Sequence, residues 1–133
     1  MLIDAGSMIT HYKPFEDKFL IAPRPNASLR TGQWIAEYVR RCLAEVSRTE
    51  IDYFLLTHFH EDHMGTVWPG RYDISPRSQF GPYQLGGVTD VAETIPIRKV
   101  IDRCYPDYSY PSPIAGPQFA NYHAFIENLP RRG

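Results

Sequence analysis

The sequence predicts an α/β fold with a parallel sheet, and three observations carry that prediction. Residues 53–56 form a continuous apolar run of β-prone side chains, as expected of a strand that is buried on both faces. Residues 31–47 repeat apolar side chains every three and four positions, which is the period of an amphipathic helix. Residues 88–102 predict a short helix followed by another strand, so helices and strands alternate as they do around parallel sheets.

The amino-terminal region predicts a strand at residues 1–3, which stops at a polar turn beginning with Asp4. Asp4 is either a turn-capping residue or a support for a nearby site. Residues 8–29 contain three prolines and are expected to be irregular apart from a short strand at residues 19–21. So long a connection is typical of a loop that shapes a site. His11 within it is either a solvated loop residue or a contact to substrate or metal.

The helix predicted at residues 31–47 has one apolar stripe and one polar face that is expected to be exposed to solvent. Thr31 is placed to cap its start. Cys42 falls on the stripe and is expected to pack as a small hydrophobe. We expect this helix to cover one face of the sheet. The stripe consists of Ile35, Tyr38, Val39, Cys42, Leu43 and Val46.

The densest group of chemically active side chains follows the central strand, in residues 57–63. Three of the five histidines fall there, together with two carboxylates. Imidazole nitrogens and carboxylate oxygens are ligands that zinc prefers, and open α/β sheets hold their sites at the carboxyl ends of strands. The alternatives are ordinary polar loop residues or a structural metal clip. Structural zinc sites usually use cysteine, however, and neither Cys42 nor Cys104 is near in sequence.

Spacing divides the candidate metal ligands into two pairs. His58 and His60 are two apart, so they would point to one side of an extended chain, and we assign them to one metal position. Asp62 and His63 are adjacent and reach a second position if the chain turns after the strand, which Gly65 permits. Asp62 is also the candidate catalytic residue, because a carboxylate there could orient an attacking water or accept its proton.

The loop after this cluster, residues 66–84, is rich in proline, glycine and aromatic side chains. We interpret it as an insertion beside the site, a lid or a substrate wall. Trp68 and Arg71 are its candidate contacts, with Arg71 suited to an anionic group. The alternative is a surface loop that a few aromatic residues anchor.

The carboxyl-terminal part predicts three further elements. Residues 88–95 are expected to form a short helix ended by Pro96, and residues 97–102 the next parallel strand, with Asp102 at its end. Residues 104–117 predict an extended connector near the mouth of the site, or else a disordered linker. A last helix begins at Pro117, which suits a first helical turn. Its apolar face carries Phe119, Tyr122, Ile126 and Leu129.

Residues 57–63 match the HxHxDH signature and so resemble the metallo-β-lactamase superfamily of metal-dependent hydrolases. Residues 2–6 look like the strand and turn that precede this signature in the family. Residues 85–102 resemble the helix-then-strand unit that follows it in the hydrolase domain of bacterial DNA-uptake channel proteins. The resemblance spans most of residues 1–105. It departs from the family pattern at Thr66, where a second glycine commonly follows Gly65.

The resemblance implies an αββα sandwich, of which residues 1–133 would be a partial domain covering the first half. It implies that Asp4 lies near the metal centre without being a principal ligand. In the family a third histidine, a further histidine and a bridging aspartate come from the second half. The carboxyl-terminal half would therefore be a missing partner. No residue of this chain matches these ligands convincingly. His123 could reach the site as a third ligand, but it falls in the middle of a predicted helix rather than after a strand.

The function that the resemblance implies is hydrolysis in which a metal-bound hydroxide attacks an ester, an amide or a phosphodiester. The expected cofactor is Zn2+, as one or two ions, with Mn2+ or iron as alternatives. The substrate would be a small molecule or a phosphodiester. Two other functions stay open: a non-catalytic metal-binding fragment and a vestigial interaction domain that lacks the second-half ligands.

Composition limits the partners of the chain. The net charge of −1 gives no global field for nucleic acid or membrane, so nucleic acid is left open without support from charge. No run approaches the ~20 apolar residues that a membrane span needs. Two cysteines give no disulfide framework and make a reducing, cytoplasmic compartment the default. A secreted or periplasmic location stays open in case the amino terminus is truncated.

Overall fold

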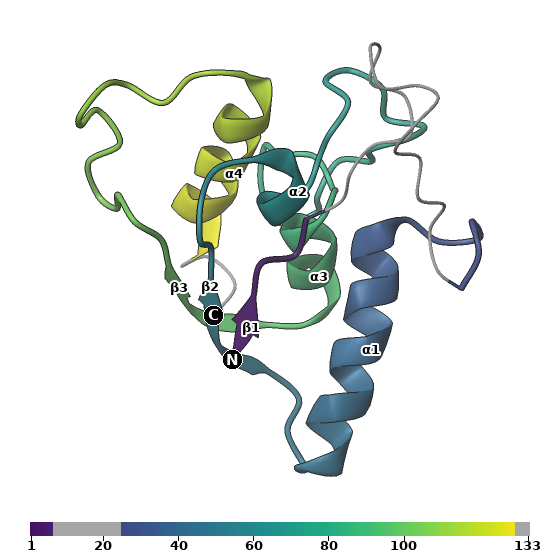
Figure 1. Ribbon diagram of the computed structural model, residues 1–133. Coiled ribbons are helices and arrows are strands. Elements are labelled where there is room, and N and C mark those ends of the chain that lie inside the picture. Colours follow the sequence, from purple (N-terminus) through teal and green to yellow (C-terminus); the bar gives the residue numbers. More distant parts are fainter. Residues whose placement is uncertain (7–24, 130–133) are drawn as a thin grey trace.

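A computed structural model describes residues 1–6 and 25–129, and shows a three-stranded parallel sheet with helices packed against it (Figure 1). The strands are β1 (Leu2–Ile3), β2 (Ile51–Leu55) and β3 (Ile97–Ile101), in the spatial order β1-β2-β3. The predicted mixed α/β class is confirmed. The helices are α1 (Thr31–Glu45), α2 (Glu61–Met64), α3 (Val88–Thr94) and α4 (Pro117–Asn128).

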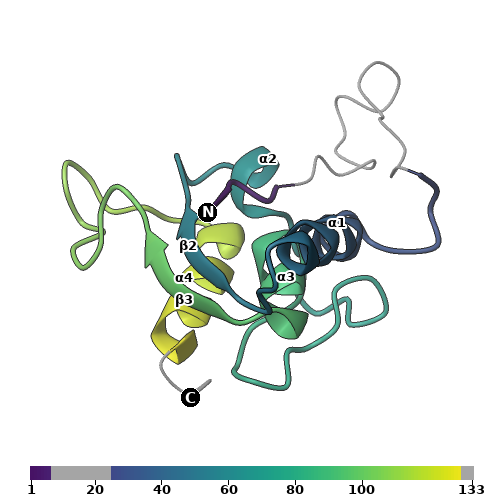
Figure 2. The same ribbon diagram turned by 90° about the horizontal axis from the view of Figure 1, so that it is seen from below.

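One face of the sheet is packed against α3 and α4, while α1 lies alongside α3 (Figures 1 and 2). Phe54 in β2 pairs in register with Leu2 in β1 and Val100 in β3, so these three side chains share the covered face. Phe54 is fully buried at its centre. The helices contribute an apolar layer to the same core, made of Val88, Val91, Ala92, Phe119, Tyr122 and Phe125.

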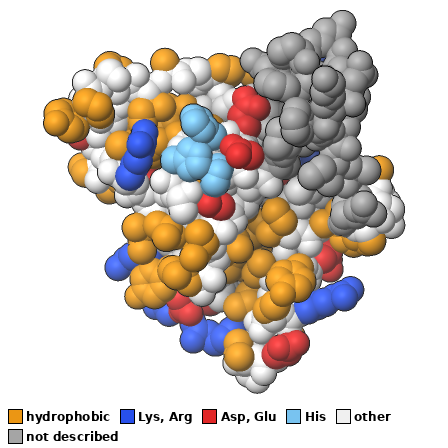
Figure 3. Space-filling view, viewed as in Figure 1, with side chains coloured by type: hydrophobic (Ala, Val, Ile, Leu, Met, Phe, Trp, Pro, Cys, Tyr) orange, Lys and Arg blue, Asp and Glu red, His pale blue; other side chains and the backbone are white. Residues whose placement is uncertain are grey.

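The opposite face of the sheet is apolar and open to solvent. Ile3, Tyr53 and Ile101 point to this side and are 51%, 45% and 41% exposed. The prediction that the central strand is buried on both faces is therefore wrong for this structure, because the helices pack on one face alone among the described residues. Figure 3 shows this apolar surface below the histidine patch.

The buried edge of α1 differs from the predicted stripe. Gly32 and Ala36 are buried against α3, and a Cβ atom at Gly32 would lie 2.4 Å from the Gly87 carbonyl oxygen. This close approach turns Tyr38 and Cys42 outward, so both are exposed and the predicted packing of Cys42 is wrong. Thr31 is not the cap either. The helix already includes it, and the flanking Arg30 backbone N–H donates to the Gln33 side chain at 2.9 Å.

The connector after β3 is ordered by the Asp102 carboxylate. Its Oδ1 accepts from the backbone N–H groups of Cys104 (3.0 Å) and Tyr105 (2.8 Å). Its Oδ2 accepts from the hydroxyls of Tyr108 (2.8 Å) and Tyr122 (2.9 Å). Burial, together with the nearby Asp102 charge, raises the pKa of both phenols, so both remain donors at neutral pH. These contacts favour the extended connector over the disordered linker.

The loop at residues 66–84 is tied to α4 and to itself. The Gln118 side chain both accepts from the Val67 N–H and donates to the Val67 carbonyl, each at 2.7 Å. The Gln84 amide donates to the carbonyls of Trp68 and Ser75. Arg71 is exposed and paired with Asp73 at 2.8 Å, so its charge is already engaged.

None of the helices in the described ranges combines the length and the apolar character needed to cross a membrane.

Candidate metal centre

The three strands end at the same edge of the sheet, and polar side chains follow each of them. Asp4 follows β1, Thr57 and His58 follow β2, and Asp102 follows β3. Because the strands are parallel, their carboxyl ends meet at one edge, where sites of open α/β sheets lie. Asp4, Thr57 and His58 contact the histidine cluster, whereas Asp102 faces the connector and α4.

Phe59 anchors the histidine loop to the core. Its ring is buried and packs edge-on against Phe119, with the ring centroids 5.2 Å apart, and against Tyr108 at 5.8 Å. The chain therefore bends at this residue instead of continuing as an extended strand. His58 is half-buried and His60 is exposed on either side of the anchor, and their rings lie 4.6 Å apart at 82°.

The single-turn helix α2 presents Asp62 and His63 beside this loop. The His60 carbonyl accepts from the backbone N–H groups of His63 (3.0 Å) and Met64 (2.9 Å), which closes the turn. Gly6 lets the chain after β1 pack directly against the backbone of α2, since a Cβ atom at Gly6 would lie 2.0 Å from the Asp62 carbonyl carbon. Sequence reasoning anticipated a turn here but not a helix.

Next to α2, the backbone crosses itself in close contact at two glycines, Gly65 and Gly87. Gly65 ends α2 with φ 103°, and Gly87 precedes α3 with φ 60°. A Cβ atom at Gly65 would lie 2.4 Å from the Cα atom of Gly87, and one at Gly87 would lie 2.5 Å from the Ala5 carbonyl oxygen. Only glycine permits both the contact and these dihedral angles. The turn at Gly65 was predicted from the sequence, whereas the role of Gly87 was missed.

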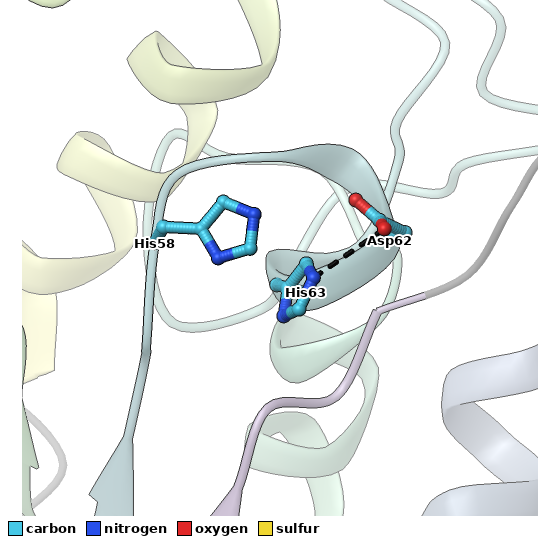
Figure 4. A group of neighbouring side chains, drawn as sticks. All are labelled: His58, Asp62 and His63. Carbon is cyan, nitrogen blue, oxygen red and sulfur yellow. Dashed lines mark ion pairs between the residues drawn. The ribbon is translucent and has the colours of Figure 1, made fainter.

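His58, Asp62 and His63 form the candidate metal-binding group. One possible ligand atom from each lies within 4.8 Å of the others, and His58 faces α2 across a short gap (Figure 4). The His58 and His63 rings are 3.7 Å apart, and His63 Nε2 lies 3.4 Å from Asp62 Oδ2. Two ligands of one tetrahedral zinc, each ~2.1 Å from it, are ~3.4 Å apart. The separation of His63 Nε2 and Asp62 Oδ2 matches this spacing, and the group of three could hold a divalent ion of the zinc type.

Asp4 fixes the orientation of His63. The Asp4 Oδ2 atom lies 2.7 Å from His63 Nδ1, and the Thr57 hydroxyl and backbone N–H donate to the same carboxylate at 2.8 and 2.9 Å. We assign the proton of His63 to Nδ1 on the basis of this contact. That assignment leaves Nε2, the nitrogen nearer Asp62, with the lone pair that a metal needs. The expectation that Asp4 lies beside the site is confirmed.

This hydrogen-bonded cluster shifts two pKa values in opposite directions. The hydrogen bond to Asp4, reinforced by the Asp62 and Asp4 charges, raises the pKa of His63. Partial burial alone would raise the pKa of Asp4, but the hydrogen bonds from Thr57 and His63 outweigh it and hold that pKa below its usual value. Without metal, the pair is therefore a carboxylate and an imidazolium over a wider pH range than isolated side chains would give.

The remaining predicted residues are placed as follows. His60 lies next to His58 but outside the three-residue group, so the structure gathers His58 with Asp62 and His63 rather than in a separate pair with His60. His123 stacks on Phe119 at 6.0 Å and 14°, and belongs to the aromatic layer of α4 rather than to the group. His11 lies outside the described residues.

Comparison of the chain with models of protein families, with curated proteins and with solved structures found no match. The resemblance carried by residues 57–63 therefore stays a prediction. The geometry of His58, Asp62 and His63 and their support by Asp4 are properties of this chain, whatever its relatives are.

Proposed function

We propose that this chain is a metal-dependent hydrolase and that His58, Asp62 and His63 hold its metal ion. The main support is the convergence of two imidazoles and a carboxylate on one point, with Asp4 orienting His63 from behind. Metal-binding histidines usually donate their second ring nitrogen to such a carboxylate.

We propose zinc as the ion, with Mn2+ or iron as alternatives. Nitrogen and oxygen donors in this ratio suit zinc, and three protein ligands with an open position are typical of catalytic rather than structural zinc sites. When bound, such an ion lowers the pKa of a coordinated water and polarises the oxygen of the bond to be cleaved. The 51% exposure of the Asp62 side chain leaves room for substrate at this edge of the sheet.

Three residues of the chain have different roles in the proposed hydrolysis. Asp62 holds the attacking water and accepts its proton, as an exposed carboxylate beside the metal can. Asp4 keeps the proton on Nδ1 of His63 and so keeps Nε2 as a ligand. His60, exposed next to His58, is available to contact the substrate or a second ion. The bond cleaved belongs to an ester, an amide or a phosphodiester.

We further propose that the fold is the αββα sandwich of metallo-β-lactamase-like hydrolases. The open apolar face of the sheet supports this proposal. Parallel sheets are normally covered on both faces, and Ile3, Tyr53 and Ile101 form a surface that a second sheet would cover in that architecture.

A non-catalytic metal-binding module is the second candidate function. One observation favours it: the described group supplies ligands for one ion, and Asp62 is needed among them. In this second function Asp62 serves as a metal ligand alone, whereas in hydrolysis it is both a ligand and the general base. This function would leave metal affinity intact and turnover absent.

Hydrolysis assays on the zinc-loaded chain separate the two functions. The probes are bis-p-nitrophenyl phosphate, a lactone and a chromogenic cephalosporin, with an Asp62→Asn variant as the control for contaminating activity. We expect turnover of at least one probe and its loss in the variant. Bound zinc without turnover of any probe would select the metal-binding module, and a chain without zinc would contradict both functions.

A further inference from the structure

A basic side chain stands beside the candidate metal centre. Arg103 follows β3, and its guanidinium carbon lies 5.6 Å from the centre of the Phe59 ring. Phe59 is the residue between His58 and His60, so the guanidinium borders the histidine loop. Figure 3 shows basic side-chain atoms directly beside the histidine patch, while acidic atoms border the patch on its other side.

The charge of Arg103 is not neutralised by any carboxylate within residues 1–6 and 25–129. The guanidinium makes a cation–π contact with Phe59 there, which leaves its N–H donors available. Most other arginines in these ranges are already paired with carboxylates. These pairs are Arg30 with Asp90, Arg40 with Glu37, Arg48 with Asp52, Arg71 with Asp73 and Arg98 with Glu50.

The position of Arg103 is set by the same core that holds the histidine loop. Asp102 accepts from the backbone N–H groups of Cys104 and Tyr105, which fixes the turn that begins at Arg103. Asp102 also accepts from the Tyr108 hydroxyl, and the Tyr108 ring packs on Phe59. The guanidinium is therefore attached to an ordered turn, and a charge held in place costs less conformational entropy when it binds.

We propose that Arg103 binds an anionic group of the substrate at the metal centre, so that this hydrolase prefers phosphate esters over neutral esters and amides. The proposal rests on the proposed function of the same site. The planar guanidinium matches two oxygens of a phosphate at once, and this match gives both affinity and orientation. A carboxylate-bearing substrate would use the same recognition and is separated from a phosphate ester by the choice of probe.

Tyr105 adds a second feature to this edge. Its ring is 6.4 Å from that of Tyr108, and the residue is 69% exposed, so the ring offers a flat face two residues after Arg103. Exposed tyrosines next to a basic side chain suit a phosphate ester whose leaving group carries a planar ring, because the ring can stack while the phosphate is held.

The test compares Arg103→Ala and Arg103→Lys with Arg41→Ala, an exposed arginine on α1 that serves as the matched control. The probes are bis-p-nitrophenyl phosphate, a carboxylate-bearing chromogenic cephalosporin and neutral p-nitrophenyl acetate. Calorimetric binding of inorganic phosphate to the zinc-loaded chain gives a readout that does not depend on turnover. Zinc content is measured for every variant.

In Arg103→Ala we expect the KM for bis-p-nitrophenyl phosphate and the Kd for phosphate to rise about 10- to 100-fold, the value of a hydrogen bond to a charged group. Zinc content and hydrolysis of p-nitrophenyl acetate by Arg103→Ala should stay within about twofold of the wild type. Arg103→Lys should recover part of the lost phosphate affinity, and Arg41→Ala should behave as wild type. A larger effect on the cephalosporin than on the phosphate probe would contradict the preference for phosphate. Unchanged phosphate affinity in zinc-loaded Arg103→Ala would overturn the role of Arg103 alone, whereas a wild-type chain that binds no zinc would overturn the proposed function.

Discussion

The Oδ2 atom of Asp4 lies 2.7 Å from Nδ1 of His63, although the two residues are 59 positions apart in the chain. The contact joins the end of β1 to α2 and holds Asp4 and His63 together at the carboxyl edge of the sheet. The first strand, which is only two residues long, is thus tied directly to the candidate metal centre.

Replacing Asp4 by Asn should weaken zinc binding about 10- to 100-fold, the usual effect of removing the partner of a metal-binding histidine. The amide cannot accept the Nδ1 proton as strongly, so the His63 ring loses its fixed orientation. Competition with a chromogenic zinc chelator measures the change. Asp107→Asn is the matched control, because Asp107 is an exposed carboxylate whose hydrogen bonds go to Ser109. Equal affinities of both variants would show that Asp4 does not support the metal.

The stability of the metal-free chain should depend on pH through the same pair. The folded pKa of His63 is raised above 6.5, so its contribution is complete below pH 6.5 and is lost as pH rises through the folded value. The folded pKa of Asp4 is lowered below 3.8, so its contribution is present above pH 3.8 and is lost as pH falls through the folded value. The pair therefore stabilises the fold most between these limits.

Urea unfolding of the metal-free chain at pH 6 and pH 8.5 tests this dependence. The urea midpoint of the wild type should be lower at pH 8.5 than at pH 6. The decrease should be smaller in Asp4→Asn, because this variant lacks the carboxylate that pairs with protonated His63. NMR titration of His63 should give a pKa above 6.5. A His63 pKa at or below this value would show that the hydrogen bond to Asp4 is absent in solution.

The glycine crossing under α2 should tolerate no side chain. We expect Gly87→Ala to lower the free energy of unfolding by roughly 1–3 kcal/mol through overpacking, and to weaken zinc binding because α2 shifts. Gly70→Ala is the matched control, since Gly70 also has a positive φ (77°) but has open space around its Cβ position. Chemical denaturation of both variants separates crowding from backbone strain. Equal losses would argue that the close contact with Gly65 is unimportant.

The anchor of the histidine loop gives a further prediction. Phe59→Leu should cost roughly 1–3 kcal/mol of stability, because the edge-on contacts with Phe119 and Tyr108 are lost, and it should also weaken zinc binding through His58. Tyr53→Leu on the open face of the sheet serves for comparison and should change stability by less than about 0.5 kcal/mol. If Phe59→Leu bound zinc as wild type, the loop would not depend on its anchor.

The sequence predicted the elements of the fold well because local patterns determine them. Apolar runs located the strands, and the three- and four-residue apolar period located α1. Pro117 located the start of α4, and Gly65 located the turn after the cluster. The buried edge of α1 was assigned wrongly because small residues carry little weight in an apolar stripe. Gly32 and Ala36 bring α1 close to α3, and that closeness is a tertiary property.

The candidate site could be predicted in composition but not in detail. The cluster of His58, Asp62 and His63 was visible as a motif, and Asp4 was expected nearby. The separation of His60 from the group depends on Phe59, whose packing against α4 bends the chain, and no local pattern announces that packing. Asp102 and Arg103 likewise gain their positions from tyrosines that lie in a connector and in α4.

Zinc stoichiometry in single-residue variants tests the central claim most directly. The metal-free chain and its His58→Ala, His63→Ala and His60→Ala variants are each equilibrated with zinc, desalted and examined by elemental analysis. The wild type and His60→Ala should retain at least one zinc per chain, whereas His58→Ala and His63→Ala should lose it. A wild-type chain without zinc, or full retention of zinc in both His58→Ala and His63→Ala, would contradict the claim that these residues hold a metal ion.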